Sequence, residues 1–409
     1  MEGGKFSKEA ITDGHPKWNE CIRRKNNLYD RPDDVRSPFA RDYNRILHCT
    51  AYRRLKHKTQ VFFATGNDHI CTRIEHVNHV ASVSYTISNY LGLNTELTNA
   101  IAVGHDLGHA PFGHTGEEIL KRIAEQELQD SFWHEKNSLC FVDKYETLPG
   151  PDGREWNLNL TYAVRDGIIL HCGEVDDMVL KPRNYVIKLE DITEVNQHMP
   201  FTWEGCLVKV ADKIAYWGRD IEDALSLRIL DDNQKKELID LVEDSIKEKI
   251  SEFNNTFIMH KFIIDICNTS DPNDGIRLSP NYFELMKRLR DFSTKHIYKH
   301  KRLEIYKQYA KLIIESIYSV LKEAYRGEDT INELNLRYSE IYPLLTKYFV
   351  EWLKKYSKNI RGYEREGKYK NDIIYDMKNY MNYLQAIIDF ISGMTDSFAV
   401  KVFNELTSF

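Results

Sequence analysis

Residues 94–118 read NTELTNAIAVGHDLGHAPFGHTGEE, and this stretch joins a helical pattern to a group of histidines. Apolar residues recur at helical spacing up to the histidines, so residues 94–109 are predicted to form a helix that ends there. Ala110-Pro-Phe-Gly113 must break that helix, because proline lacks a backbone donor and clashes with the preceding turn. Thr115-Gly-Glu-Glu118 has the pattern of a capping box and predicts the start of a new helix.

The histidines are concentrated in one part of the chain, since nine of fifteen fall between His48 and His134. Neighbouring residues on a helix point about 100° apart, so His105 and Asp106 can share an ion only if it lies beside their helix. Other elements must complete the ligand set. His76 begins one helical pattern and Asp212 lies in another, so these four residues are predicted to bind a divalent metal. The alternative for each residue alone is a satisfied polar side chain at a helix end.

His114 and Glu117 fall together at the start of the next predicted helix. A helix N-terminus favours an anion through its free N–H groups and its dipole. A histidine paired with a carboxylate beside a metal suits general acid–base chemistry. The alternatives are a loop histidine and a common helix-start acid.

Helical periodicity dominates the remaining sequence, as in residues 305–321 and 373–391. Strand signals are few: Val61-Phe-Phe63 before Gly66-Asn-Asp68 predicts half of a short hairpin, and residues 148–153 predict a turn. The expected fold is all-α, with minor β-hairpins. The polar loop Asn268–Pro280 suggests a division into an N-terminal polar segment (1–35), a catalytic core (36–267) and a C-terminal helical region (268–409).

Composition argues for a protein of the cytoplasm. The net charge of -6 disfavours a protein that mainly coats nucleic acid. No apolar run approaches the roughly 20 residues of a membrane span, and Met1–Lys5 has no apolar signal core. Seven scattered cysteines without a C-x-x-C pair predict reduced thiols.

An ordered set of sequence blocks resembles the HD-domain deoxynucleoside triphosphate triphosphohydrolases, which include bacterial dGTPases and the SAM-and-HD-domain enzymes. The matching blocks follow the family order over nearly the whole chain. They are RSPFARDYNRILHCTAYRRLKHKTQVF (36–62), TRIEHVNHV (72–80), HDLGHAPFGHTGEE (105–118), FWHEKNS (132–138), GIILHCG (167–173), ADKIAY (211–216) and SGMTDSFA (392–399).

The resemblance implies an HD-type helical core and hydrolysis of a dNTP to deoxynucleoside and inorganic triphosphate, with dGTP among the substrates. It implies that His76, His105, Asp106 and Asp212 are the metal ligands. It also implies proton transfer by His114, with Glu117 behind it. His109 and His134 would line the site near the scissile bond, although a structural role stays open for His109. The ion could be Mn, Mg, Fe, Zn, Co or Ni, because nitrogen and oxygen ligands accept all of them.

The resemblance further implies a set of substrate contacts. Gln60 would lie near the sugar, and Tyr216 and Asp220 would be sugar and phosphate neighbours. The phosphate-binding residues would be Arg73, Lys213 and Arg290. Tyr298 would pack under the deoxyribose, where its ring would crowd a 2′-hydroxyl. Solvated charge for Arg290 and a core position for Tyr298 are the alternatives.

Family members usually form tetramers or hexamers, and some respond to a dNTP or to single-stranded DNA, so the resemblance implies a homo-oligomer with such an effector. Two other functions stay open. One is another HD-type phosphohydrolase that acts on a nucleoside monophosphate or an alarmone. The other is a non-catalytic protein that senses nucleotides or single-stranded DNA.

Overall fold

The computed structural model describes residues 4–26, 34–63, 67, 69–150, 152–172, 177–365 and 367–408. Seventeen α-helices account for most of this described part, which confirms the predicted all-α class. In chain order the helices are α1 (Trp18–Ile22), α2 (Pro38–His48), α3 (Thr50–Arg54), α4 (Arg73–Leu91), α5 (Thr95–Gly104), α6 (Gly113–Leu128), α7 (His134–Cys140), α8 (Tyr162–Ile169), α9 (Trp203–Ser226), α10 (Asp232–Ile246), α11 (Asn255–Thr269), α12 (Pro280–Ser293), α13 (Lys301–Glu323), α14 (Thr330–Glu333), α15 (Pro343–Tyr356), α16 (Tyr380–Ser392) and α17 (Asp396–Thr407).

Three short strand pairs accompany the helices in the described residues. The antiparallel pair β1 (Thr147–Pro149) and β2 (Glu155–Asn157) is joined at the predicted turn. β3 (Val179–Leu180) and β4 (Ile276–Arg277) are also antiparallel, whereas β5 (Ser357–Lys358) and β6 (Tyr375–Asp376) are parallel.

The chain forms two compact units whose segments alternate along the sequence. Unit 1 comprises residues 1–46, 64–106 and 160–305, and unit 2 comprises residues 47–63, 107–159 and 306–409. The chain therefore passes from unit 1 to unit 2 directly after Asp106. The division of the sequence after residues 35 and 267 stays a prediction.

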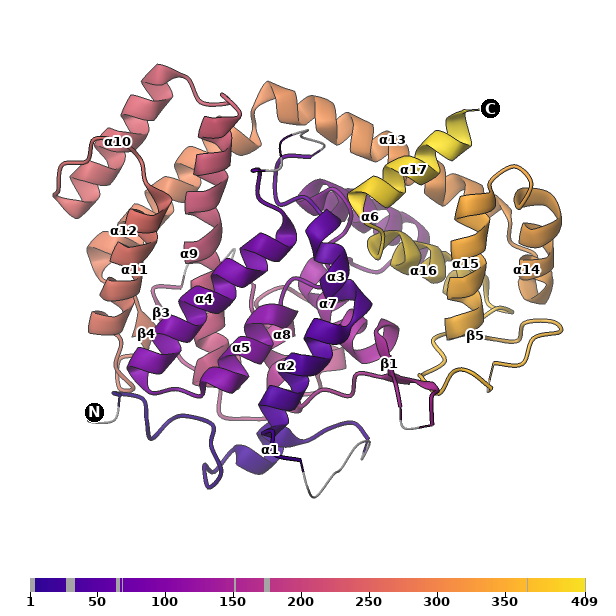
Figure 1. Cartoon of the computed structure of the whole chain (residues 1–409), viewed down its shortest axis with the longest axis horizontal. Coiled ribbons are helices and arrows are strands. Elements are labelled where there is room, and N and C mark those ends of the chain that lie inside the picture. Colours follow the sequence, from indigo (N-terminus) through magenta and orange to yellow (C-terminus); the bar gives the residue numbers. More distant parts are fainter. Residues whose placement is uncertain are drawn as a thin grey trace. The chain divides into compact units, whose positions relative to one another are not determined.

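Unit 1 is built around α4, which packs against α5 and α9, while α8 packs against α5 and α9 (Figure 1). α4 begins with a capping box between Thr72 and Glu75, and it ends at Gly92 in the left-handed region. Both features satisfy backbone groups that a helix end leaves open. Val77, Val80 and Ile87 are fully buried along the inner face of α4.

Two glycines let α5 and α8 approach closely just before the histidines. A Cβ on Gly104 would lie 2.6 Å from Ile168 Cδ1, and a Cβ on Gly167 would lie 2.6 Å from Ile101 Cδ1. Both distances are far below van der Waals contact, so a side chain at either position would force the facing isoleucine to shift. This packing fixes the end of α5, where His105 follows.

Unit 2 is a second helical group. α6 packs against α16, and α15 packs against α16 and α17. From residue 306 onward α13 buries Ile313, Ile317 and Leu321, in agreement with the predicted helix. Leu312, which belongs to the same predicted apolar stripe, is 54% exposed, so the buried face is rotated away from part of that stripe.

Several element boundaries differ from prediction. Val61-Phe-Phe63 is a bend rather than a strand, because Phe62 and Phe63 are both buried and the Phe63 ring packs on Phe112. Gly66 and Asp68 of that predicted hairpin lie outside the described residues.

Three helix ends also moved. α5 ends at Gly104, five residues before the predicted end, and Thr115 lies inside α6, which begins at Gly113 after Phe112 adopts a φ of 66°. The predicted helix from residue 373 begins only at Tyr380, because the Asn379 side chain caps the N–H groups of Met381 and Asn382.

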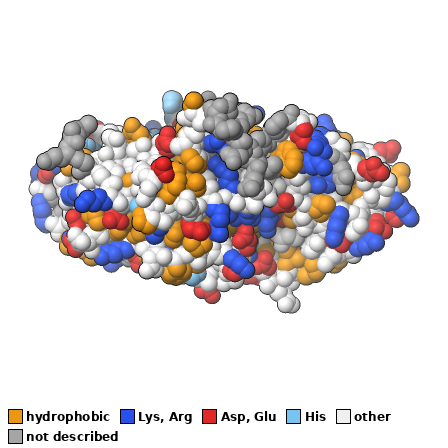
Figure 2. All heavy atoms as spheres, turned by 90° about the horizontal axis from the view of Figure 1, so that it is seen from below, with side chains coloured by type: hydrophobic (Ala, Val, Ile, Leu, Met, Phe, Trp, Pro, Cys, Tyr) orange, Lys and Arg blue, Asp and Glu red, His pale blue; other side chains and the backbone are white. Residues whose placement is uncertain are grey.

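Among the described residues no helix combines the length and apolar character needed to cross a bilayer. On the face shown in Figure 2, Lys and Arg side chains alternate with Asp and Glu, and the described residues there form no large area of one charge.

Glu204 holds the N-terminal segment against unit 1. It lies at the start of α9 and is fully buried, and its Oε1 accepts hydrogen bonds from the backbone N–H groups of Ile11 at 3.1 Å and Asn94 at 3.0 Å. Burial raises the pKa of the Glu204 carboxyl from its ordinary 4.5 to about 7, although the two N–H donors lower it.

We expect Glu204 to make unit 1 less stable as the pH rises. When the pKa of a carboxyl is higher in the folded state than in the unfolded state, the carboxyl leaves the free energy of unfolding unchanged below the unfolded-state pKa. As the pH rises from there through the folded-state pKa, the carboxyl lowers the free energy of unfolding. We therefore compare the free energy of unfolding of Glu204→Gln with that of the unchanged protein. The variant's advantage should grow by up to about 3 kcal/mol between about pH 5 and about pH 8. Urea unfolding at both pH values measures this change, and the exposed Glu252→Gln is the control. An equal difference at the two pH values would contradict the prediction.

Candidate metal centre and histidine cluster

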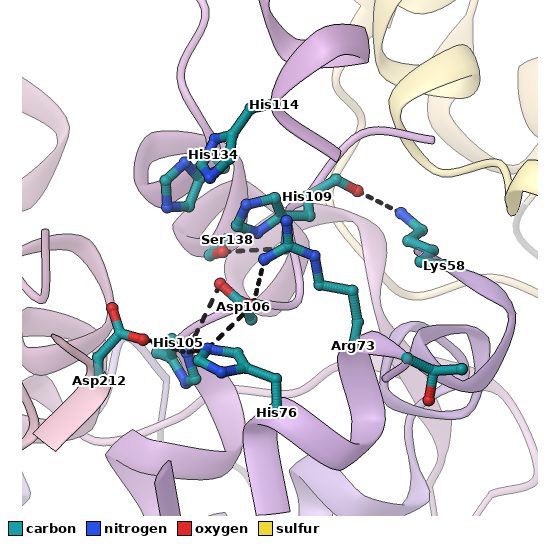
Figure 3. Close-up of polar contacts among 12 residues, drawn as sticks. Lys58, Arg73, His76, His105, Asp106, His109, His114, His134, Ser138 and Asp212 are labelled. Atoms are coloured by element: carbon teal, nitrogen blue, oxygen red, sulfur yellow. Dashed lines mark hydrogen bonds and ion pairs between the residues drawn. The ribbon is translucent and has the colours of Figure 1, made fainter. Parts of the chain in front are cut away.

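The four predicted metal ligands lie together within unit 1. α4 presents His76, α9 presents Asp212, and His105 and Asp106 follow the end of α5. Figure 3 shows the two imidazoles between the two carboxylates. All four residues lie on or directly after α4, α5 and α9, which pack against one another in this unit. The packing of these three helices therefore sets the positions of the four side chains.

The ligand atoms of His76, His105 and Asp212 lie within 4.8 Å of one another, and the Asp106 carboxylate lies beside the two imidazoles. His76 Nε2 lies 3.0 Å from Asp212 Oδ1 and 3.4 Å from His105 Nε2. Asp106 Oδ1 lies 3.5 Å from His105 Nε2, and Asp106 Oδ2 lies 3.8 Å from His76 Nε2. Two ligands of one ion, each about 2.1 Å away, lie roughly 3.0–3.4 Å apart. The separations of 3.0 and 3.4 Å fit one divalent cation between His76, His105 and Asp212. The Asp106 oxygens lie slightly further out, at 3.5 and 3.8 Å.

The orientation of His105 suits metal binding. Its Nδ1 lies 2.6 Å from the backbone oxygen of Ala102, which acts as a hydrogen-bond acceptor and so fixes the proton on Nδ1. Nε2 is then left with its lone pair on the side of His76 and Asp106. Such a backbone partner behind a ligating histidine is typical of metal sites.

Asp106 is paired with a buried arginine. Arg73 Nη1 donates to Asp106 Oδ2 at 2.8 Å, and both side chains are almost fully buried. Removing one partner of such a pair costs about 3–5 kcal/mol, because the other charge stays buried. The predicted phosphate-binding residue Arg73 thus lies directly against a predicted metal ligand.

The electrostatics of Asp212 favour a carboxylate. Burial by itself raises the pKa of the Asp212 carboxyl, but the hydrogen bond with His76 and the charges of His105 and His171 hold that pKa below its ordinary value. Two imidazoles and two carboxylates supply the nitrogen and oxygen donors that divalent ions such as Zn, Fe and Mn accept.

A second cluster lies in unit 2 and gathers the four predicted catalytic residues. The rings of His109 and His134 are 4.0 Å apart between centroids, and His114 lies 5.4 Å from His109 (Figure 3). Glu117 Oε2 is 3.2 Å from His114 Nδ1 and 3.1 Å from His134 Nδ1. One carboxylate thus holds two imidazoles.

Glu117 is anchored and ionised. Its Oε1 also accepts the backbone N–H of His134 at 2.8 Å, at the start of α7. Burial raises the pKa of Glu117, but the charge of His134 and the hydrogen bonds from His114 and His134 hold it well below its ordinary value. The His114 side chain is 58% exposed, whereas that of His134 is 12% exposed, so His114 is the more accessible proton carrier.

The loop between His109 and His114 is held from two sides. Phe112 has a left-handed backbone, which is strained for an aromatic residue, and its N–H donates to Asp396 Oδ1 at 2.9 Å. Asp396 Oδ2 accepts the N–H of Thr59 at 2.9 Å. Lys58 Nζ donates to the backbone oxygens of His109 and Ser392.

Two of the predicted substrate neighbours, Tyr216 and Asp220, lie on one face of α9 together with Asp212. Asp212, Tyr216 and Asp220 are spaced four residues apart, so they follow one another along that face. Tyr298 donates its hydroxyl hydrogen to Asp220 at 2.7 Å. Burial raises the pKa of Asp220 to about 7, with the Tyr298 hydrogen bond and the charges of His76 and Arg73 opposing it.

The other predicted substrate contacts are more scattered. Lys213 follows Asp212 on α9 and is buried. Arg290 lies in α12 beside Asp291, at 3.4 Å, and its side chain is 34% exposed. Gln60 is buried in unit 2.

Sequence reasoning gave no role to three residues that support these clusters. The His171 ring contacts the His105 ring edge-on, with 4.9 Å between the ring centroids. His171, His105 and Asp106 each offer one possible metal-ligand atom, and these three atoms lie within 4.8 Å of one another. Lys58 and Asp396 hold the His109 loop. All three lie inside sequence blocks that resemble the family. This position in a block is the only feature of the sequence that pointed to a role for them.

Comparison with known proteins identifies the domain and its relatives. The HD domain matches residues 73–217, from the first residue of α4 to α9. A deoxyguanosinetriphosphate triphosphohydrolase-like protein of Caldanaerobacter subterraneus subsp. tengcongensis is 31% identical over 374 residues, which cover 91% of this chain and 86% of the relative. Proteins of the same description from Clostridium tetani and Desulfatibacillum aliphaticivorans are 31% and 36% identical, covering 93% and 66% of this chain and 88% and 69% of the relatives.

The matched HD segment contains all four residues of the buried His/Asp centre, and the similarity to the relatives extends well beyond it on both sides. The chain belongs to the HD-domain family of deoxyguanosinetriphosphate triphosphohydrolase-like proteins.

Proposed function

We propose that this protein is a metal-dependent enzyme that hydrolyses a dNTP, dGTP among them, to deoxynucleoside and inorganic triphosphate. The observation that carries the proposal is the convergence of His76, His105 and Asp212 within 4.8 Å, with Asp106 oxygens 3.5 and 3.8 Å from the two imidazoles. The relatives' description as deoxyguanosinetriphosphate triphosphohydrolase-like supports the substrate class.

These four residues would hold a divalent ion. Once bound, the ion would supply charge neutralisation at a phosphate and a lower pKa for water. The chain's own contribution is to lower the pKa of Asp212, to hold Asp106 through Arg73 and to orient the His105 ring through the Ala102 backbone oxygen. Arg73 keeps Asp106 in place and, in this role, leaves phosphate binding mainly to Lys213 and Arg290.

The second cluster would move the proton. Hydrolysis at the α-phosphorus needs a proton on the leaving 5′-oxygen, and an imidazolium is suited to donate it near neutral pH. Glu117 would hold the imidazoles in position, since its Oε2 lies 3.2 Å from His114 Nδ1 and 3.1 Å from His134 Nδ1. Both clusters lie within the segment that matches the HD domain, and this supports one reaction served by both.

Substrate selection would fall to the other predicted residues. We assign the sugar to Gln60, Tyr216, Asp220 and Tyr298. The hydrogen bond from Tyr298 to Asp220 would fix the ring, so that its face can crowd a 2′-hydroxyl. A homo-oligomer of tetramer or hexamer size, a dNTP or single-stranded DNA effector and a cytoplasmic location stay predictions.

The deciding experiment is incubation of the protein with each dNTP and each NTP, with Mn or Mg, followed by chromatography. Release of inorganic triphosphate and deoxynucleoside supports the proposal. Release of pyrophosphate or orthophosphate, or hydrolysis only of a nucleoside monophosphate or an alarmone, would favour another HD-type phosphohydrolase. No hydrolysis of any of these would favour a sensor.

The two clusters should separate in their effects on metal and turnover. Asp106→Ala removes a ligand and leaves Arg73 buried without its partner, so metal content should fall along with activity. His114→Ala should keep the metal and lower turnover by roughly 10²–10⁴-fold, as expected for loss of a general acid. Elemental analysis after dialysis and triphosphate release measure the two effects. Equal metal content in both variants would contradict this division of roles.

Tyr298 should set the preference for deoxy sugars. Tyr298→Ala removes the ring, and we expect the activity ratio of GTP to dGTP to rise about 10-fold or more. Tyr298→Phe keeps the ring and loses only the hydrogen bond to Asp220, so it is the matched control and should keep most of the discrimination. The ratio of kcat/KM for the two nucleotides is the measurement. A ratio that rises equally in both variants would assign the effect to the hydroxyl rather than to the ring.

A further inference from the structure

The cluster of His109, His114, Glu117 and His134 has the composition of a transition-metal site. Each residue offers one ligand atom, and these four atoms lie within 4.8 Å of one another. All four residues belong to unit 2, whereas the metal centre described above belongs to unit 1. Three imidazoles and one carboxylate are a common ligand set for zinc.

The geometry around Glu117 fits a bound cation as well as it fits hydrogen bonds. The single atom Oε2 lies 3.1 Å from His134 Nδ1 and 3.2 Å from His114 Nδ1. These separations match the roughly 3.0–3.4 Å between two ligands of one zinc ion. A cation can therefore replace the protons that now join these nitrogens to the carboxylate, while each neutral imidazole keeps one proton on Nε2.

The cluster is also anchored and reachable. Glu117 is held by the backbone N–H of His134, and the His109 backbone is held by Lys58. A preset ligand geometry lowers the ordering cost of binding. The exposed His114 side chain gives an ion access from solvent.

We propose that His109, His114, Glu117 and His134 form a second metal site, selective for Zn²⁺ and similar imidazole-preferring ions, whose occupation inhibits the enzyme. Imidazole ligands favour Zn and Cu, whereas Mg and Mn prefer oxygen. An imidazole that binds zinc through Nδ1 cannot take up a second proton, so it cannot become the imidazolium that the proposed reaction uses as its acid. The inhibition rests on the proposed function, but the metal site does not.

The site is tested first by binding, without nucleotide. The full chain, stripped of metal, is titrated with Zn²⁺ against a chromophoric chelator. We expect two ions per chain in the unchanged protein and one in Glu117→Gln or His134→Ala, with the lost site weakened at least about 10-fold. Asp212→Asn should lose the other ion and keep this one, and the exposed His260→Ala should keep both. Circular dichroism checks that each variant is folded.

A spectroscopic readout separates a real site from a folding defect. Co²⁺ in place of Zn²⁺ gives visible absorption whose intensity reports coordination geometry. The second equivalent of Co²⁺ should add a band that Glu117→Gln lacks and Asp212→Asn retains. One ion per chain in the unchanged protein, or two in Glu117→Gln, would overturn the proposal.

Inhibition is tested separately on the Mn-loaded enzyme. Excess Zn²⁺ should suppress triphosphate release, and the same concentration of Mg²⁺ should not. Two bound zinc ions without any inhibition would keep the site and reject its effect on turnover. An enzyme inactive on every nucleotide would reject the proposed function and leave the binding result intact.

Discussion

A buried group of two histidines and two aspartates constrains the rest of unit 1. Charged side chains are costly to bury unless their charges are compensated. Here Arg73 compensates Asp106, and the histidines compensate Asp212. Satisfying these groups requires α4, the end of α5 and α9 to stay in register, and the glycines between α5 and α8 allow that close packing. The polar centre and the apolar core are therefore parts of one arrangement.

The segment His105–His109 joins two chemical tasks. On one side of the Asp106–Leu107 bond lie the predicted metal ligands His105 and Asp106, and on the other side lie the residues around Glu117 that we propose for proton transfer. Both proposed tasks use imidazole chemistry, and the surroundings of the histidines differ. His105 has a backbone acceptor and acidic neighbours, whereas His114 has an anchored carboxylate and access to solvent.

Much of this arrangement could be predicted from local sequence. Helical periodicity gave α4, α9 and α13, and the resemblance brought His76 and Asp212 together with His105-Asp106 across more than a hundred residues. Helix ends were less predictable, because they depend on tertiary contacts. α6 begins at Gly113 because Phe112 is held in a left-handed conformation by Asp396, which lies 284 residues further along the chain. No local pattern reveals such a partner, and for the same reason Lys58 and His171 received no role.

The dependence of the His109 loop on Ser392 and Asp396 also bears on how the polypeptide is made. The ribosome synthesises the His109 loop long before it synthesises Ser392 and Asp396. A nascent chain therefore already contains the histidines of both clusters when the Phe112 N–H still lacks its acceptor, Asp396. Unit 2 can close only after residues beyond 390 have left the exit tunnel. Proton-transfer competence would then come late in biosynthesis, after the segments of unit 1 have already been released.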